Sequence, residues 1–483
     1  MVNSYEKYEA VIGLEVHAQL LTKTKAYSSD ENVYGAKPNT KTSTISLGHP
    51  GTLPRSNSKV IEYAVKLGIA VGSKIRKRNE YARKNYFYAD LPKGYQITQD
   101  KTPICNGGSI LIKDNEGNDK NINITRIHME EDAGKSIHDL DPFHTLIDLN
   151  RAGVPLVEIV SEPDIKTSNE AYQYINEVKK LVRYLDICDG NMEEGSLRCD
   201  ANVSVMLKGA RKFGTKVEVK NMNSSRNIKR AIEFEIERQI KILEEGKEVA
   251  HETRSFNAAN NTTIAMRHKE EANDYRYFPE PDLQPIIITE KYIANLKQKL
   301  PPLPNTLFLK FTKEFGLSQY DANILVDEKG IALYYNELCN FTKNYKSAAN
   351  FVNGSIKSYL KENAVNINDF SISPKQLASL IRFVDDGKIS NTIATSKVFP
   401  KMLETDDLAD KIAVDNKWVQ ESNSDALSDY IKQAIMKYPD KVVEYKAGKK
   451  GLIGLFMGEV MKLSKGQADP KITNKLLKTE LEK

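Results

Sequence analysis

Apolar and polar residues alternate in short runs along much of the first 165 residues, and turn residues interrupt these runs. Clusters of glycine, proline and asparagine at residues 48–51, 92–94 and 115–118 mark the turns. One segment differs, because apolar residues recur every three to four positions from residue 58 to about 71, which predicts a helix. Short strands joined by turns, with few helices, predict a largely antiparallel sheet.

Helical and strand-like patterns then follow one another. Thr167-Ser-Asn-Glu170 is typical of a helix start, and an apolar face at helical spacing follows it. Alternation returns at residues 202–206 and 216–219. A second long helix is predicted from about residue 225, and Gly246 is placed to end it.

Three domains follow from these patterns. Prolines between residues 300 and 304 break regular structure and predict a linker. Beyond them the pattern is helical, and its last part is rich in lysine. We therefore predict an α+β fold: a mixed, largely antiparallel sheet domain at 1–297, an all-helical middle domain at 298–405 and a small helical tail domain at 406–483.

Composition excludes several classes of protein. In 483 residues no apolar run approaches the ~20 residues that span a bilayer, and the N-terminus lacks a signal-peptide pattern. The four cysteines form no CxxC motif, which favours reduced thiols and a cytoplasmic location and argues against a cysteine zinc site. The net charge of +5 is small, so any nucleic-acid binding must come from a local patch.

Acidic and imidazole side chains crowd the end of one predicted strand, at His128, Glu130, Glu131 and Asp132. Like charges at this density are unfavourable unless a cation binds among them. Carboxylates with an occasional imidazole suit Mg²⁺, Mn²⁺ or Zn²⁺. For this stretch alone, a solvated acidic turn is an equally good interpretation.

A second candidate half-site lies near the N-terminus, where Glu15 and His17 share one face of a predicted strand. The polar face of an edge strand is the alternative. Glu130 and Glu131 are adjacent, so on a regular strand they face opposite sides and reach one centre only at a bend. We therefore favour two neighbouring cations, an arrangement common in phosphoryl chemistry.

Two further predicted strands carry polar side chains at alternate positions. Arg198, Asp200 and Asn202 share one face of the first. Residues 216, 218 and 220 of the second are lysine, glutamate and lysine. Cations for phosphate oxygens and carboxylates for Mg²⁺ are what phosphoryl transfer needs, although a surface ladder of salt bridges is the alternative.

Two segments mix aromatic and basic residues. Lys84, Tyr86 and Lys93 surround a turn and could contact an anion or a base, but a tyrosine-rich strand pair packed on the sheet is the favoured interpretation of this segment alone. Arg276 lies among three aromatic residues and two prolines, which suggests a loop that binds a base or an adenine, or one that closes a core. No P-loop or Rossmann glycine motif is present.

The tail carries an excess of lysine around a glycine-rich apolar run. A solvated helix face is the usual meaning of such charge, but lysines beside glycines also suit phosphates. The candidate phosphate-binding residues are Lys446, Lys449, Lys450, Lys462 and Lys465.

Several long motifs together resemble the GatB family, the B subunits of aspartyl/glutamyl-tRNA amidotransferases. They occur in the family's order and are spread nearly from end to end of the chain, which has no room for the inserted domain of the archaeal relative GatE. The motifs are VIGLEVHAQL, KNYFYADLPKGYQITQ, RIHMEEDAGK, PLVEIVSEPD, MEEGSLRCDANVSV, DYRYFPEPDL and the C-terminal KGQADP.

The resemblance implies a cradle domain, a helical domain and a tail domain that binds tRNA. It implies that ATP and Mg²⁺ are used to phosphorylate the side-chain carboxylate of glutamate or aspartate mischarged on tRNA, and that ammonia then displaces phosphate. An amidase (glutaminase), the family's A subunit, would supply the ammonia, and a small C subunit would complete a heterotrimer. A second, structural metal such as Zn²⁺ is left open.

The resemblance also assigns roles to residues. The implied metal ligands are Glu15, His17, Glu130, Glu131 and Glu158. The implied catalytic residues are Glu15, Glu131, Arg198, Asp200 and Lys220. The candidates for ATP or aminoacyl contacts are Lys84, Tyr86, Lys93, Asn202, Lys216, Glu218 and Arg276. A non-catalytic tRNA-binding scaffold and a metal-dependent hydrolase remain the competing hypotheses.

Overall fold

The computed structural model describes residues 6–266, 275–405, 407–419, 424–464, 468 and 470–482. It divides into two compact units, Met1–Leu303 and Pro304–Lys483. The division falls inside the proline-rich stretch that was predicted as a linker. The predicted further division at residue 406 stays a prediction.

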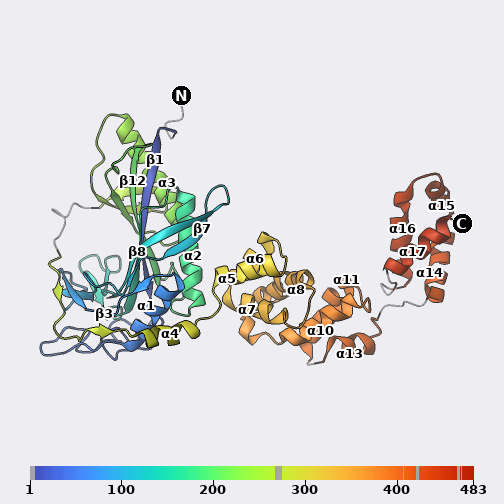
Figure 1. The fold of residues 1–483 in the computed structure, drawn as a ribbon, viewed down its shortest axis with the longest axis horizontal. Helices are drawn as coiled ribbons and strands as arrows, with labels where there is room; N and C mark the ends of the chain where they lie inside the picture. Colours follow the sequence, from blue (N-terminus) through green and yellow to red (C-terminus); the bar gives the residue numbers. More distant parts are fainter. Residues whose placement is uncertain are drawn as a thin grey trace. The chain divides into compact units, whose positions relative to one another are not determined.

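The first unit is built on a mixed sheet in which most neighbouring strands pair antiparallel, so the predicted α+β class is confirmed (Figure 1). The strand order is β15-β14-β13-β12-β1-β11-β8-β6-β2, and β7 also pairs with β8. Only the β13–β14 pair within this sheet is parallel, among the residues that the structure describes. Its strands are β1 Tyr8–Gln19, β2 Lys74–Ile75, β6 Cys105–Asn106, β7 Ser109–Lys113, β8 Asp119–Glu131, β11 Pro155–Ser161, β12 Leu197–Leu207, β13 Val217–Lys220, β14 Thr253–Asn257 and β15 Thr262–Ala265.

Three predicted helices are confirmed: α1 Ser58–Ala70, α2 Ser168–Tyr184 and α3 Ser225–Glu244. Each begins after a residue whose side chain accepts a backbone N–H of the first turn, as helix starts require. The pattern at Thr167 is only half of a capping box. Glu170 N–H donates to the Thr167 hydroxyl, but the Glu170 carboxylate accepts the N–H of Lys166 instead.

The two faces of the sheet differ because side chains alternate along each strand. On β1, Leu14, Val16 and Ala18 are fully buried in a core shared with residues of α1, α2 and α3. Burying each of the larger side chains contributes about 1.5–3 kcal/mol. The residues between them, Glu15 and His17, lie on the opposite face, which leaves that face for chemistry.

A small sheet brings two distant segments together. It has the order β16-β4-β5, with β4 Ala82–Asn85, β5 Tyr95–Thr98 and β16 Phe278–Pro279. Arg83 donates from Nε and Nη2 to the two carboxylate oxygens of Glu280, at 2.6 and 2.9 Å. The remaining elements of this unit are β3 Arg78–Asn79, β9 Lys135–Ile137, β10 Leu146–Asp148, β17 Ile286–Ile287 and α4 Glu290–Gln298.

The second unit is helical throughout the part that the structure describes, as predicted. Its earlier helices are α5 Pro304–Leu309, α6 Gln319–Val326, α7 Lys329–Leu338, α8 Tyr345–Phe351, α9 Lys357–Asn363, α10 Pro374–Asp385, α11 Asn391–Ile393, α12 Phe399–Glu404 and α13 Ala409–Asp415. The helices α14 Ser424–Lys437, α15 Pro439–Lys446, α16 Ile453–Leu463 and α17 Pro470–Glu482 share a core of their own. Among the described residues, no helix combines the length and apolarity needed to cross a bilayer.

Candidate functional site

A row of polar side chains crosses four adjacent strands of the large sheet. Arg198 on β12 is paired with His17 on β1, and His17 is paired with Glu158 on β11. Glu158 in turn is paired with His128 on β8. Glu130 follows His128 by two positions on the same strand, so it lies on the same face.

Three of these side chains form a group that could hold a metal ion. One ligand atom from each of His17, Glu130 and Glu158 lies within 4.8 Å of the other two. His17 Nε2 is 3.4 Å from Glu158 Oε2 and 4.0 Å from Glu130 Oε2. One imidazole and two carboxylates fit Mg²⁺, Mn²⁺ or Zn²⁺. We call these three residues the triad.

The triad is buried enough to shift the ionisation of its members. Burial raises the pKa of Glu130, with a further rise from the charge of Glu158, and Lys84 only partly offsets both. Burial also acts to raise the pKa of Glu158, but hydrogen bonds from His128 and His17 hold it well below the usual value. A divalent cation would stabilise both carboxylates in their charged forms.

Two predicted ligands lie outside the triad. Glu15 Oε1 accepts a hydrogen bond from Asn202 Nδ2 at 2.9 Å. Glu131 Oε1 accepts the Ile97 N–H at 2.8 Å and forms an ion pair with Lys93. The structure therefore brings together three of the five predicted ligands. Lys93 already balances the charge of the Glu131 carboxylate. A second metal ion beside Glu131 remains a prediction.

The family resemblance alone predicted Glu158 as a metal ligand. His128 was noted as part of the crowded acidic stretch but was not among the predicted ligands. The signal for Glu158 is weak: it is a single acid in the apolar strand β11. Its place in the candidate metal site becomes evident only from the strand register, which places it between His17 and His128.

Ionic contacts extend the polar face from the triad across β12 and β13. Arg198 Nη2 is 2.8 Å from Asp132 Oδ2. Lys220 Nζ is 2.6 Å from Asp200 and 2.8 Å from Glu218. Burial acts to lower the pKa of Lys220, but these two carboxylates raise it overall, so the lysine stays a cation.

Lys216 is exposed just before β13. Burial acts to raise the pKa of Glu218, but the charges of Lys220 and Lys216 lower it. A phosphate contact for Lys216 remains a prediction.

The aromatic segments meet beside the triad. Lys84 Nζ lies 3.8 Å from Glu130 Oε1 and 4.9 Å from the centre of the Tyr275 ring. The Tyr86 hydroxyl donates to Gln96 Oε1 at 3.2 Å, and its ring meets Tyr275 edge-on at 5.8 Å. The two predicted binding segments thus form one surface.

Arg276 belongs to the same segment and is exposed. Its φ of 38° lies in the left-handed region, and its carbonyl accepts a hydrogen bond from Asn85. Its backbone therefore joins the segment to β4.

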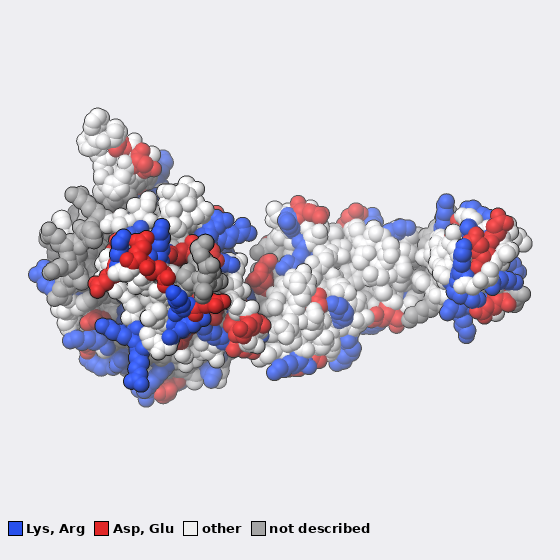
Figure 2. All heavy atoms as spheres, turned by 90° about the horizontal axis from the view of Figure 1, so that it is seen from above, with Lys and Arg blue, Asp and Glu red and all other residues white. Residues whose placement is uncertain are grey.

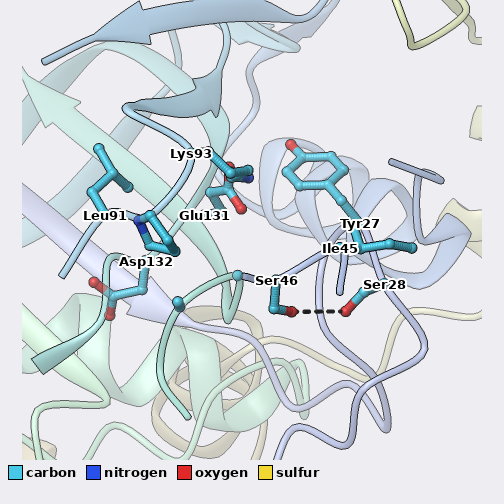
Figure 3. Close-up of a pocket in the computed structure, with 11 residues that line it drawn as sticks. Tyr27, Ser28, Ile45, Ser46, Leu91, Lys93, Glu131 and Asp132 are labelled. Carbon is cyan, nitrogen blue, oxygen red and sulfur yellow. Dashed lines mark hydrogen bonds and ion pairs between the residues drawn. The ribbon is translucent and has the colours of Figure 1, made fainter. Parts of the chain in front are cut away.

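A small pocket opens on the Glu131 side of β8 (Figure 3). Figure 3 shows Glu131 beside Lys93, while the Asp132 carboxylate points away from Ser28 and Ser46. The pocket is lined by Tyr27, Ser28, Ile45, Ser46, Leu91, Pro92, Lys93, Glu131, Asp132, Ala152 and Gly153. The fully buried Lys25 lies against Gly153, and burial lowers the pKa of Lys25 to about 8 despite the charges of Asp30 and Glu131.

The predicted phosphate-binding lysines of the tail differ in exposure and in their contacts. Lys449 forms an ion pair with Glu444 at 3.0 Å, and Lys450 lies 4.3 Å from the centre of the Tyr445 ring. Lys446 and Lys462 are exposed at the ends of α15 and α16, and Lys465 lies outside the described residues. Figure 2 shows acidic side chains among the basic ones, so the charge of this surface is mixed.

Comparison with known proteins first defines the class. The family model of the GatB/GatE catalytic domain matches residues 10–294, and that of the GatB domain matches residues 333–481. The chain belongs to the GatB family.

Individual relatives match over nearly their full length. The B subunit of the aspartyl/glutamyl-tRNA(Asn/Gln) amidotransferase of Bdellovibrio bacteriovorus is 47% identical over 475 residues, which cover 98% of this chain and 99% of that protein. The protein of the same name from Syntrophotalea carbinolica is also 47% identical, with the same two coverages. That of Thermodesulfovibrio yellowstonii is 46% identical over 471 residues, or 98% of each chain.

Proposed function

We propose that this chain is the B subunit of an aspartyl/glutamyl-tRNA(Asn/Gln) amidotransferase and that its sheet unit activates the carboxylate of a mischarged glutamate or aspartate. The observation that carries the proposal is the triad of His17, Glu130 and Glu158, with Lys84 3.8 Å from Glu130. The family match supports the same activity, a carbon–nitrogen ligation that uses glutamine as nitrogen donor.

The chemistry requires an activation step. A free carboxylate does not react with ammonia at a useful rate, because its leaving group would be oxide. Transfer of the terminal phosphoryl group of ATP to a carboxylate oxygen gives an acyl phosphate and ADP. Ammonia then attacks the acyl carbon, the carbon–oxygen bond to phosphate breaks, and the amide forms with release of phosphate.

The residues present fit Mg²⁺, which His17, Glu130 and Glu158 would hold and which would neutralise phosphate charge during the transfer. Glu15 lies on the same face as the triad, and Asn202 fixes its carboxylate. Arg198 and Lys220 lie on β12 and β13, to one side of the triad, and can bind phosphate oxygens. Asp132, Asp200 and Glu218 hold their side chains in place. We assign the adenine or the aminoacyl end to the surface of Lys84, Tyr86, Tyr275 and Arg276.

The partners follow from the reaction. We propose that an amidase, the A subunit, supplies the ammonia and that a small C subunit is the third member of the complex. Mischarged tRNA would bind the tail domain through its lysines. Glu131 and Lys93 pair with each other apart from the triad, so we do not assign them to the metal ion that the triad would hold.

The test uses the complex of this chain with the amidase and the small third protein. We expect ATP hydrolysis that depends on Glu-tRNA or Asp-tRNA, and its loss in Glu158→Gln while tRNA still binds. Formation of Gln-tRNA or Asn-tRNA should be lost in parallel. Substrate turnover without ATP would instead favour a metal-dependent hydrolase, and tRNA binding without ATP use would favour a scaffold.

A further inference from the structure

His128 is the most deeply buried imidazole at the proposed site, and no role has so far been given to it. Its side chain is 5% exposed, whereas that of His17 is 20% exposed. His128 Nε2 lies 3.1 Å from Glu158 Oε2 and 3.9 Å from Glu130 Oε2. Its other ring nitrogen, Nδ1, is buried and has no hydrogen-bond partner.

The surroundings of the two ring nitrogens show which of them donates a hydrogen bond. A buried N–H without an acceptor loses a full hydrogen bond, whereas an unused acceptor nitrogen costs less. Nδ1 has no acceptor to donate to, and Nε2 faces a carboxylate oxygen at hydrogen-bond distance. The proton therefore resides on Nε2, which donates it to Glu158 Oε2.

We propose that His128 is a positioning residue, whose Nε2–H orients the Glu158 carboxylate toward the metal ion shared with His17 and Glu130. The inference rests on the metal-binding part of the proposed function. It does not depend on ATP or on tRNA.

The strand register makes this role specific. Glu158 and His128 are direct partners across β11 and β8, so their Cβ atoms are about 4.5–5.5 Å apart, within reach of a side-chain contact. Glu158 has three rotatable side-chain bonds, and holding one carboxylate oxygen removes much of that freedom before a metal binds. Hydrogen bonds of this kind to a metal ligand change metal affinity by about 10–100-fold.

The burial of the two histidines separates their roles. Both imidazoles reach the same oxygen, Glu158 Oε2, but the side chain of His17 is 20% exposed and that of His128 only 5%. A metal ion that exchanges with solvent is thus held by His17, while His128 acts through Glu158.

A pair of amide substitutions tests the donated hydrogen bond. The amide nitrogen of glutamine reaches the place of histidine Nε2, and that of asparagine reaches only the place of Nδ1. We expect His128→Asn to weaken binding of Mn²⁺ to the full-length chain by about 10–100-fold and His128→Gln to stay within about threefold of wild type. The exposed His138→Gln is the matched control for the chemical change, and thermal unfolding confirms that each variant folds.

A spectroscopic measurement separates positioning from ligation. Electron spin-echo modulation of bound Mn²⁺ detects nitrogen ligands. We expect one imidazole nitrogen in wild type, its retention in His128→Gln and its loss in His17→Ala. Loss of a second nitrogen signal in His128→Gln would make His128 a ligand and overturn the proposal, as would equal Mn²⁺ affinities of the asparagine and glutamine variants.

The positioning role can fail separately from the proposed function. If wild-type chain and Glu158→Gln bind Mn²⁺ equally, the triad is not a metal site, and both proposals fall. If Glu158→Gln abolishes binding but the two His128 variants match wild type, only the positioning role falls.

Discussion

Glu130 and Glu131 are neighbours in the sequence but lie on opposite faces of β8. Glu130 Oε2 faces the imidazoles of His17 and His128, at 4.0 and 3.9 Å. Glu131 accepts the Ile97 N–H and pairs with Lys93. The strand thus places the Glu130 carboxylate in the triad and the Glu131 carboxylate beside the ammonium group of Lys93.

This separation predicts different outcomes for two identical substitutions. Glu130→Gln should weaken Mn²⁺ binding by at least about tenfold, because it removes a charged ligand. Glu131→Gln should leave Mn²⁺ affinity within about threefold of wild type but lower the melting temperature, because breaking a buried pair costs roughly 3–5 kcal/mol. Titration with Mn²⁺ and thermal unfolding measure both effects. If Glu131→Gln lost as much Mn²⁺ affinity as Glu130→Gln, Glu131 would have to be a metal ligand.

Local patterns in the sequence predicted the strands, the main helices and the polar faces, because each depends on residues close together in the chain. Alternation places Glu15 and His17 on one face from ten residues alone. The sequence pattern could not predict that Glu158 joins His17, because that contact depends on the pairing of strands far apart in the chain. The ion pair between Arg83 and Glu280, which are 197 residues apart in the sequence, could not be predicted for the same reason.

The Arg83–Glu280 pair should stabilise the small sheet through its two-point geometry. The Glu280 side chain is fully buried, so Arg83→Lys removes one of the two hydrogen bonds that the guanidinium donates to its carboxylate, although Oε1 keeps the N–H of Asp282. We expect a loss of about 1–3 kcal/mol in the free energy of unfolding of the first unit. Arg78→Lys is the matched control, because its pair with Glu80 is exposed and contributes at most about 1 kcal/mol. Urea unfolding compares the two, and equal effects would contradict the role of the paired geometry.

The exposed tail lysines should carry the salt dependence of tRNA binding. Lys446→Glu with Lys462→Glu should weaken tRNA binding by the whole complex and lower the dependence of log Kd on log salt by about one per lost phosphate contact. Glutaminase activity should not change. Lys361→Glu, in α9, is the control for charge reversal outside the tail. A salt dependence identical to wild type would exclude these two lysines from the interface.

Lys25 should give the chain a pH dependence of stability at alkaline pH. Burial lowers its pKa from 10.5 to about 8 in the folded chain. Between these values the unfolded chain keeps a proton that the folded chain has lost, so the free energy of unfolding rises with pH, by at most about 3 kcal/mol. Lys25→Met should therefore be more stable than wild type at pH 7, because Asp30 keeps its bonds from Ser43 and Ser46, and this advantage should shrink toward pH 10.5. Urea unfolding across this range measures the difference, and a constant difference would contradict the lowered pKa.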